Sequence, residues 1–336
     1  MAQIRVTSER RLGIVRDMCR EFSDLASRTI AKKLYAQHPK LFKSLEVARS
    51  SVRICRGNAG AANRKSGVAD KSLYRQSGSQ SDRPPLPKSL SKPWEPYVLD
   101  AARVLVLSDI HLPHHDELAV ELALEHGDEF EPDAILLNGD TLDFEAISKF
   151  DKPIGASIKD ELVVGRQFLA HLRHRFPAAK IVLKRGNHEE RWDTYFWRKA
   201  IELEELCRDV WQHFLGTEDY GVEVIGDQRP IMCGKLMVLH GHEKGRGMQS
   251  SVNPARGAFL RLMCSTLEGH GHRTSEHTER TADGRVIACR SSGCLCDLHP
   301  AYARLNRWDQ SFATVEVAAD GDYECRLHRI VNGKVR

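Results

Sequence analysis

The sequence contains no uninterrupted apolar run that approaches the roughly 18 residues a transmembrane helix needs. Its mean hydropathy is -0.44, and its hydrophobic content of 41% suits an ordinary globular core. The first residues, Met1 to Val6, include no apolar segment typical of a secretory signal. No internal repeat is present. We therefore expect a cytoplasmic protein that has no membrane partner.

Paired cysteines at regular spacing are also missing. The chain has nine cysteines, an odd number scattered over 336 residues, which favours reduced thiols over a disulfide framework. Cys294 and Cys296 form a close pair, but no second pair lies at zinc-site spacing. We interpret these two as buried thiols in a strand.

The charges are distributed unevenly along the chain. Residues 1–98 carry 20 Lys and Arg against 8 Asp and Glu, whereas the remainder carries 30 against 38. A basic arm on an acidic body suggests different partners for the two parts, and nucleic acid is the first candidate for the arm. We predict three regions: a basic helical module at 1–58, a flexible linker at 59–98 and a catalytic body at 99–336.

Three short helices are predicted in the basic module. Apolar spacing indicates one helix over 9–21, a second that Ser27 caps, and a third from about Leu41 to Gly57. Three arginines share one face of the third helix, which resembles the recognition helix of a helix-turn-helix module: Arg49, Arg53 and Arg56. A small bundle with a solvated basic face is the alternative interpretation.

Strands and helices alternate in the body, which predicts an α/β fold with a buried β core and helices outside. The helices are expected at 117–125, 158–173, 191–207 and 254–267, and short strands at 286–289, 312–317 and 323–330. Asp320-Gly321 is a hairpin signal between the last two strands.

Polar clusters follow the apolar runs of the body. The run Val104–Leu107 ends near Asp109 and His111, and three later runs end at residues 138–143, 185–189 and 240–242. A fifth cluster stands at 269–272. Open α/β sheets keep their ligands at the carboxyl ends of strands, and alternate residues share a face if a strand continues. These side chains are therefore expected to meet and to bind divalent metal.

Together the five clusters resemble the calcineurin-like metallophosphoesterase superfamily, whose pattern is D-x-H, G-D-x-x-D, G-N-H-[D/E], a later H, and G-H-x-H. Here the pattern reads Asp109-Ile110-His111, Gly139-Asp140-Thr141-Leu142-Asp143, Gly186-Asn187-His188-Glu189, His240 and Gly269-His270-Gly271-His272. The resemblance implies a four-layered α/β/β/α sandwich with two metal ions over roughly 103–330. A basic helical module ahead of this body is also similar to proteins of bacteriophages and integrated elements.

Carried over residue by residue, the resemblance implies two sets of metal ligands. One metal takes Asp109, His111 and His272, the other takes Asn187, His240 and His270, and Asp140 bridges both. A mixed nitrogen and oxygen site admits several cations, so we expect manganese, with iron, zinc, nickel or magnesium as alternatives. Metal-bound hydroxide is the expected nucleophile toward phosphorus.

Two further residues are predicted to act in the reaction. His188 follows a ligand and is expected to reach the site and to protonate the leaving oxygen. Asp143 is expected to hydrogen-bond His188 and orient it.

The residue that follows Asp143 helps to predict which class of substrate is bound. Protein Ser/Thr phosphatases have an arginine there, which grips the phosphate, whereas this sequence has Phe144. The leading hypothesis is hydrolysis of a phosphodiester or phosphomonoester linked to nucleic acid, as a nuclease or nucleotide phosphatase. The alternatives are a phosphoprotein phosphatase, or a DNA-binding regulator with an auxiliary esterase body.

Overall fold

The computed structural model describes residues 2–62, 71–73, 86–91, 93–149, 157–245 and 252–336. The chain divides into two compact units, Met1–Lys92 and Pro93–Arg336. Much of the predicted linker, 63–70 and 74–85, lies outside the described residues. The linker prediction extends too far at its end, because Tyr97–Val98 form strand β1 of the second unit.

Among its described residues the first unit includes the helices α1 (Ala2–Glu21), α2 (Ser27–Gln37) and α3 (Leu45–Cys55) and a 3-10 turn, η1 (Lys71–Leu73). Their apolar faces form one small core that includes Val15, Ile30, Leu34, Phe42 and Val52. Two predicted helix starts are wrong. Ser27 lies inside α2, whose N-cap is Ala26 without a side-chain bond, and α3 begins only after Ser44 caps it.

A seven-stranded sheet forms the centre of the second unit, in the order β13-β12-β11-β2-β3-β4-β5. Strands β2 to β5 are parallel, whereas β11, β12 and β13 extend the sheet in antiparallel fashion. Their bounds are β2 (Arg103–Leu107), β3 (Ala134–Asn138), β4 (Lys180–Lys184), β5 (Val222–Ile225), β11 (Gln310–Val317), β12 (Tyr323–Val331) and β13 (Lys334–Val335).

The second sheet has six strands in the order β1-β6-β7-β8-β10-β9. Strand β7 pairs with β8 in parallel, so the polar residues that follow both strands lie at the same edge. The bounds are β1 (Tyr97–Val98), β6 (Ile231–Cys233), β7 (Leu236–Leu239), β8 (Thr266–Glu268), β9 (Ser275–Arg280) and β10 (Val286–Ser291).

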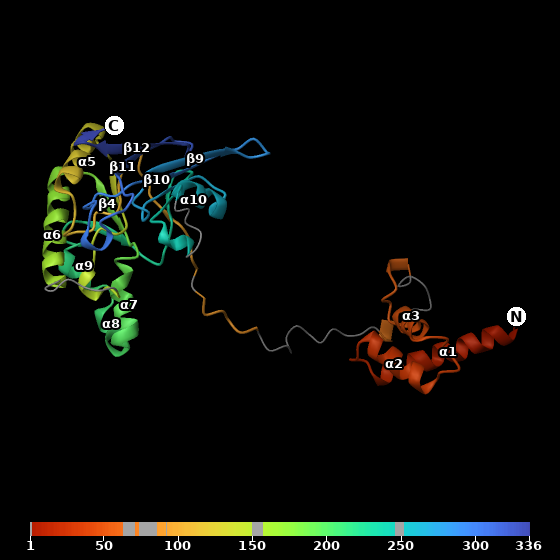
Figure 1. Cartoon of the computed structure of the whole chain (residues 1–336). Coiled ribbons are helices and arrows are strands. Elements are labelled where there is room, and N and C mark those ends of the chain that lie inside the picture. The colour runs from red at the N-terminus through yellow and green to blue at the C-terminus, as the bar shows by residue number, and fades with distance from the viewer. Residues whose placement is uncertain (1, 63–70, 74–85, 92, 150–156, 246–251) are drawn as a thin grey trace. The chain divides into compact units, whose positions relative to one another are not determined.

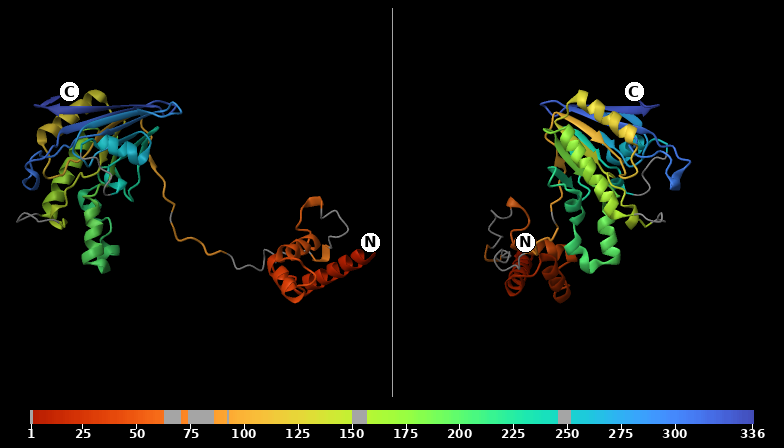
Figure 2. Two further views of the ribbon diagram at one scale, coloured as in Figure 1. Left: turned by 45° about the vertical axis from the view of Figure 1, so that its right-hand side comes forward. Right: turned by 90° about the vertical axis from the view of Figure 1, so that its left-hand side faces the viewer.

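Helices cover the outer face of each sheet, which gives the predicted order helix, sheet, sheet, helix (Figure 1). On the seven-stranded sheet lie α5 (Glu117–Phe130), α6 (Ile158–Arg175) and α9 (Val210–Leu215), whose buried residues share one apolar core with that sheet. Helix α10 (Pro254–Leu262) packs on β10. Figure 2 shows α5 and α6 running across the same face. The predicted four-layered α/β fold is confirmed.

The uninterrupted apolar runs of the central strands are explained by burial on both faces. Leu105 and Leu107 of β2 point into the core under α5 and α6. Val104 and Val106 point into the second core, which lies between the two sheets and includes Val238 of β7. One strand therefore contributes to two cores, with side chains alternating between them.

Two predicted helices are shorter than expected. The stretch 191–207 is divided into α7 (Glu190–Lys199), a 3-10 turn, η4 (Ile201–Leu203), and α8 (Glu204–Cys207). The stretch 254–267 is helical only to Leu262, because Met263 adopts the left-handed conformation that ends α10. Thr266–Glu268 then form β8, since apolar periodicity alone does not distinguish a buried strand from a buried helix. Within the described residues, no helix is long and apolar enough to cross a lipid bilayer.

Candidate metal centre

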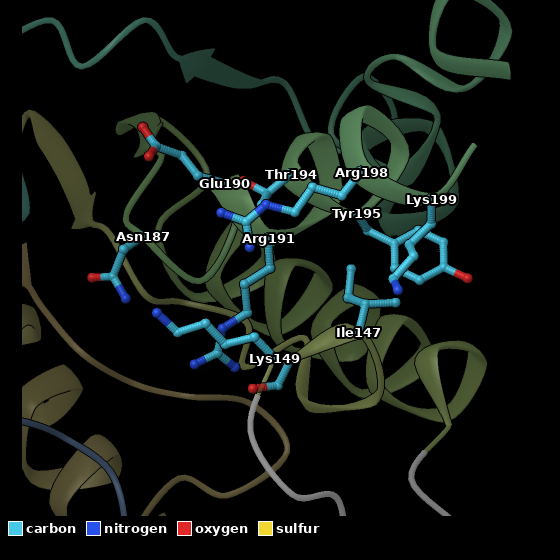
Figure 3. Close-up of a pocket in the computed structure, with 10 residues that line it drawn as sticks. Ile147, Lys149, Asn187, Glu190, Arg191, Thr194, Tyr195, Arg198 and Lys199 are labelled. Carbon is cyan, nitrogen blue, oxygen red and sulfur yellow. The ribbon is translucent and has the colours of Figure 1, made fainter. Parts of the chain in front are cut away.

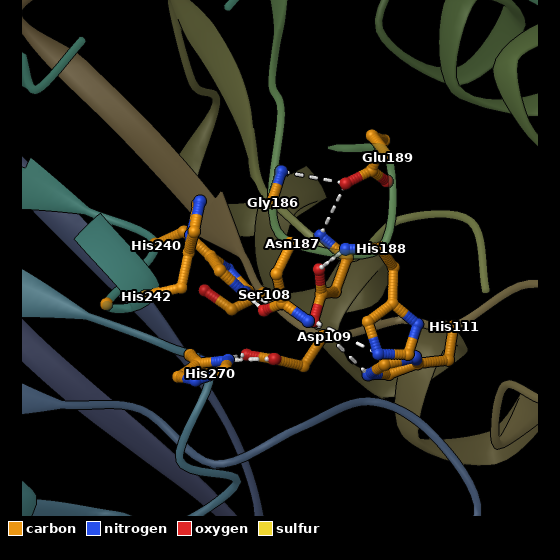
Figure 4. A network of polar contacts seen from close by, with 12 residues as sticks. Ser108, Asp109, His111, Gly186, Asn187, His188, Glu189, His240, His242 and His270 are labelled. Atoms are coloured by element: carbon orange, nitrogen blue, oxygen red, sulfur yellow. Dashed lines mark hydrogen bonds and ion pairs between the residues drawn. The ribbon is translucent and has the colours of Figure 1, made fainter. Parts of the chain in front are cut away.

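The seven predicted metal ligands converge at the carboxyl ends of five strands. Figure 4 shows five of them: Asp109, His111, Asn187, His240 and His270. The loops that supply them follow strands of both sheets, so residues far apart in the sequence meet at one edge. After β2 come Asp109 and His111, after β3 Asp140, after β4 Asn187, after β7 His240, and after β8 His270 and His272.

Most of these ligands have an unusual backbone conformation. Five of the seven have positive φ, between 50° and 62°: Asp109, His111, Asp140, His270 and His272. Residues other than glycine rarely adopt this left-handed conformation, which is enriched at functional sites. Strand β2 ends at Leu107, so strand alternation does not bring Asp109 and His111 together, contrary to the expectation from the sequence. The left-handed turns aim the side chains instead.

The first group of donors contains Asp109, His111 and His272. Nε2 of His272 lies 3.1 Å from Oδ1 of Asp109 and 3.2 Å from Nε2 of His111. All three side chains are buried. Asp109 also accepts the backbone N–H of His270 at 2.8 Å, which fixes its carboxylate between the loops after β2 and β8. Donor atoms this close together, pointing at one another, suit a shared cation.

The second group contains Asn187, His240 and His270. Nε2 of His240 lies 3.2 Å from Oδ1 of Asn187, and the donor atoms of Asp140, His240 and His270 all lie within 4.8 Å of one another. Nδ1 of His240 is 2.8 Å from the carbonyl oxygen of Asn138. That contact directs Nε2 toward the other donors, as outer hydrogen bonds do for histidine ligands.

Asp140 lies between the two groups. Its Oδ2 is 3.2 Å from Nε2 of His240 and 3.9 Å from Nε2 of His111. Burial opposes ionisation, but the neighbouring His188 and His240 hold the pKa of Asp140 well below its usual range. Burial likewise opposes protonation of His240, yet the Asp140 carboxylate raises the pKa of that imidazole to about 10. Two buried carboxylates surrounded by imidazoles form a donor set that fits divalent cations.

Two glycines of the motifs allow the loops to approach this closely. Gly139 has a φ of 85°, and a Cβ there would clash with the ring of His240. A Cβ on Gly186 would clash with the carboxylate and backbone nitrogen of Asp140. A side chain at position 139 would displace His240, and one at position 186 would displace Asp140.

Glu189 has a structural role that the sequence did not reveal. Its buried carboxylate accepts four backbone N–H groups: those of Asp140 at 3.0 Å, Thr141 at 2.8 Å, Leu142 at 3.0 Å and Gly186 at 2.8 Å. It therefore ties the loop after β3 to the loop after β4. The glutamate of G-N-H-E was visible as part of the motif, but only the fold shows which amides it binds.

Asp143 contacts both His188 and His111. Its Oδ1 is 2.6 Å from Nδ1 of His188 and 3.2 Å from Nδ1 of His111. Burial opposes ionisation of Asp143, but these two imidazoles hold its pKa far below the usual range. A guanidinium nitrogen of Arg191 lies 2.7 Å from Nε2 of His188. Because arginine only donates, Nε2 of His188 accepts and Nδ1 carries the proton toward Asp143.

Phe144 follows Asp143 in a left-handed conformation and is buried against Trp192 and Trp211. Its backbone N–H donates to the carboxyl group of Glu161. Burial raises the pKa of Glu161 to about 8 from an ordinary value of 4.5. The site therefore holds a carboxyl group that is neutral at physiological pH and that supports the loop carrying Asp143.

Glu161→Gln is expected to stabilise the metal-free protein at alkaline pH. The folded chain keeps the Glu161 proton up to about pH 8, whereas the unfolded chain releases it near 4.5. The contribution of Glu161 to the stability of the wild type therefore falls as pH rises between these values, and the variant lacks this contribution. We expect the variant to be more stable by on the order of 2 kcal/mol at pH 8.5, and the difference to shrink toward pH 5. Urea unfolding across this range measures it.

Glu125→Gln, on the exposed face of α5, is the matched control and should show no such trend. A difference between wild type and Glu161→Gln that stays constant with pH would mean that Glu161 is ionised in the folded protein.

Cys296 and Cys294 lie beside the first group of donors, which corrects their interpretation as strand thiols. Both are buried, but they lie after the end of β10. Cys294 forms an isolated β-bridge with Gln310, and Cys296 forms one with His115. One nitrogen each of His111 and His272 and Sγ of Cys296 all lie within 4.8 Å of one another. The sequence shows that one residue separates the two cysteines, but it does not show that Cys296 lies beside His111 and His272.

The three arginines predicted to bind nucleic acid do not share one exposed face. Arg56 is buried, and its guanidinium donates to the carbonyls of Phe22, Ser23 and Leu25, so it closes the small helical core instead. Arg53 is exposed, and Arg49 forms an ion pair of 3.4 Å with Glu46. For Arg49 and Arg53 the contact with nucleic acid stays a prediction.

A family model described as calcineurin-like phosphoesterase matches residues 102–283. The chain therefore belongs to this family, whose members act on phosphate esters with divalent metal ions. A comparison with curated proteins finds no match.

Solved structures with similar folds include two Vps29 proteins and a phosphoesterase. Vacuolar protein sorting 29 from Cryptosporidium parvum is 13% identical, with 70% of this chain and 95% of that chain covered and a TM-score of 0.38. Vps29 from Chaetomium thermophilum is also 13% identical, with 70% and 94% covered and a TM-score of 0.36. Yfce, a phosphoesterase from E. coli, is 14% identical, with 67% and 98% covered and a TM-score of 0.33.

Proposed function

We propose that the chain is a dinuclear metal-dependent hydrolase that cleaves a phosphodiester or phosphomonoester of nucleic acid or nucleotides. The observation that carries this proposal is the position of Asp140 between two groups of donors, within 3.2 Å of His240 and 3.9 Å of His111. A carboxylate so placed can bridge two cations at the separation that suits in-line displacement at phosphorus.

Asp109, His111 and His272 would hold one cation, and Asn187, His240 and His270 the other. When bound, the pair would supply Lewis acidity and a hydroxide nucleophile at neutral pH. The residues of the chain itself hold these ligands in place and position the proton donor. The backbone N–H of His188 donates to Oδ1 of Asp140 at 2.9 Å, which helps to hold that carboxylate in place.

His188 is placed to handle the leaving group. Its Nδ1 is fixed by Asp143, and its Nε2 lies 3.8 Å from Oδ2 of Asp140, facing the two groups of donors. Arg191 donates to that same Nε2. An arriving phosphate oxygen would attract the guanidinium more strongly, so Nε2 would be free to bind a proton from solvent and to pass that proton to the leaving oxygen.

A basic cavity next to the site favours an extended anionic substrate (Figure 3). It has a volume of about 370 Å³ and is lined by Asn187 of the second donor group together with Arg191, Tyr195, Arg198 and Lys199. Cations beside the reacting phosphate suit a neighbouring phosphate, and an aromatic ring offers a stacking surface for a base. Phe144 is buried, so the arginine position of protein Ser/Thr phosphatases has no phosphate contact here.

Removing two of these cations together, as Arg198→Ala with Lys199→Ala, is expected to raise KM for single-stranded DNA about tenfold, or roughly 1.4 kcal/mol. The kcat on a small chromogenic diester should stay nearly unchanged, because that compound does not reach the cavity. The salt dependence of DNA binding should also weaken, by about 0.7 in log-log slope for each phosphate that the protein no longer neutralises.

The matched control is Arg326→Ala with Lys334→Ala, on strands β12 and β13, and it should leave both substrates unaffected. Equal KM changes in the two double variants would show that the cavity does not select the substrate.

A substrate panel tests the proposed function itself. The purified chain of 336 residues, with added manganese, is given a chromogenic phosphodiester, a phosphomonoester, a phosphopeptide, a nucleotide and linear DNA. We expect cleavage of a diester, nucleotide or DNA. Cleavage of the phosphopeptide alone would overturn the link to nucleic acid and favour a phosphoprotein phosphatase.

The basic first unit belongs to the same proposal. Residues 1–92, which form this unit, carry 20 basic against 7 acidic residues, and Arg53 is exposed on α3. This charge would hold the chain on DNA through phosphate contacts. A DNA-binding regulator with an auxiliary esterase body is the alternative, and it predicts tight, salt-sensitive DNA binding by residues 1–58 alone.

A further inference from the structure

The segment 294–297 is fastened along the loop that carries Asp109 and His111. The backbone N–H of Leu295 donates to the carbonyl of Asp109 at 3.0 Å, and that of Asp297 donates to the carbonyl of His114 at 2.9 Å. The carbonyl of Leu295 in turn accepts the N–H of Asp116 at 2.9 Å. These bonds lie on both sides of Cys296, so its position relative to the first donor group is set by the backbone.

The side chain of Cys296 faces the donors of that group. Its Sγ and one nitrogen each of His111 and His272 all lie within 4.8 Å of one another, and the three residues are each at most 6% exposed. Cys296 also lines a cavity of about 220 Å³ together with His111 and Asp143. The thiol therefore borders both the predicted metal position and the space from which a ligand would arrive.

Three of the other four buried cysteines of this unit have apolar surroundings, whereas Cys294 contacts His272 and Cys296. Cys233 and Cys325 belong to the core between the two sheets, and Cys289 packs with α10. Cys296 belongs to none of the apolar clusters formed by the described residues and lies among histidines and carboxylates instead. Packing explains the first three thiols but does not explain a sulfur placed among metal donors.

We propose that Cys296 is an additional metal ligand, binding as a thiolate the cation that Asp109, His111 and His272 hold. This inference rests on the proposed dinuclear centre. On binding, the thiol loses its proton to solvent and Sγ forms the metal bond. Thiolate donors favour zinc and iron over manganese and magnesium. The two positions then differ, with a softer cation at the Cys296 position and a harder one at the Asn187 position.

X-ray absorption at the zinc edge tests this directly on the full chain loaded with zinc. A thiolate ligand gives a sulfur shell at about 2.3 Å, distinct from nitrogen and oxygen at about 2.0–2.2 Å. We expect the sulfur shell in the wild type, its loss in Cys296→Ser, and its retention in Cys289→Ser. Cys289 is the matched control because it is equally buried and its thiol donates to the carbonyl of Cys264.

Two zinc ions per chain with no sulfur shell in the wild type would overturn the thiolate ligand and leave the dinuclear centre intact. A chain that binds no zinc would overturn the proposed function as well. A sulfur shell that persists at full strength in Cys296→Ser would assign the sulfur to another cysteine and would also refute the proposal. If Cys296→Ser does not fold, the wild-type spectrum still shows whether a sulfur ligand is present. Cys296→Ala then serves as the second variant in which the sulfur shell should be lost.

Discussion

Asp140→Asn is expected to abolish turnover and to weaken metal loading at both positions. The Asp140 carboxylate is the donor that reaches both groups, at 3.2 Å from His240 and 3.9 Å from His111. An amide keeps the volume but removes the negative charge and one of the two donor oxygens. Losing an outer hydrogen-bond partner typically costs 10–100-fold in affinity or activity, so loss of the bridging ligand should lower kcat by about 10³-fold or more.

The measurement is kcat on a chromogenic diester over a manganese titration, with metal content determined in parallel. Asp219→Asn serves as the control, because Asp219 is an exposed partner of Arg166 and the same chemical change there should have no effect. Wild-type turnover of Asp140→Asn at saturating metal would refute the bridging role.

His188→Ala is expected to lower kcat by about 10²–10⁴-fold, the usual contribution of general acid–base catalysis, while two metals per chain remain bound. His188 is held at Nδ1 by Asp143, and its Nε2 faces Asp140 from 3.8 Å. The loss should be smaller for substrates with a good leaving group, because an acidic leaving oxygen needs no proton. Comparing nitrophenyl and alkyl esters measures this difference.

His174→Ala, on the exposed face of α6, should behave as the wild type in the same assay. The donor atoms of His111, Asp140 and His188 also lie within 4.8 Å of one another. If His188→Ala lost one of the two metals, His188 would be a ligand and its role as proton donor would be wrong.

Apolar runs in the sequence predict β2, β3, β4 and β7 and the polar loops that follow them, whereas β8 lies in a stretch where the sequence predicts a helix. Runs such as Val104–Leu107 are apolar because both faces of the strand are buried, and the carboxyl ends of parallel strands meet at one edge. The sequence thus indicated which residues gather at that edge. It did not indicate how they are aimed, since the left-handed backbone of Asp109 and His111 leaves no periodic signal.

Other features depend on tertiary contacts and could not be predicted locally. Glu189 binds amides of a loop about 48 residues away in the sequence, and Cys296 meets His111 only when the two sheets assemble. Arg56 has helical spacing to Arg49 and Arg53, yet its guanidinium is buried because it donates hydrogen bonds to the carbonyls of Phe22 and Leu25, which follow α1. Helical periodicity cannot separate a buried cation with backbone partners from an exposed one.

Crystals of the full chain soaked in manganese, with anomalous difference maps, test the central claim most directly. We expect two peaks about 3.5–4 Å apart, one contacting Asp109, His111 and His272, the other contacting Asn187, His240 and His270, with Asp140 touching both. A single peak outside these residues, or no peak at all in protein that still hydrolyses phosphate esters, would contradict the account.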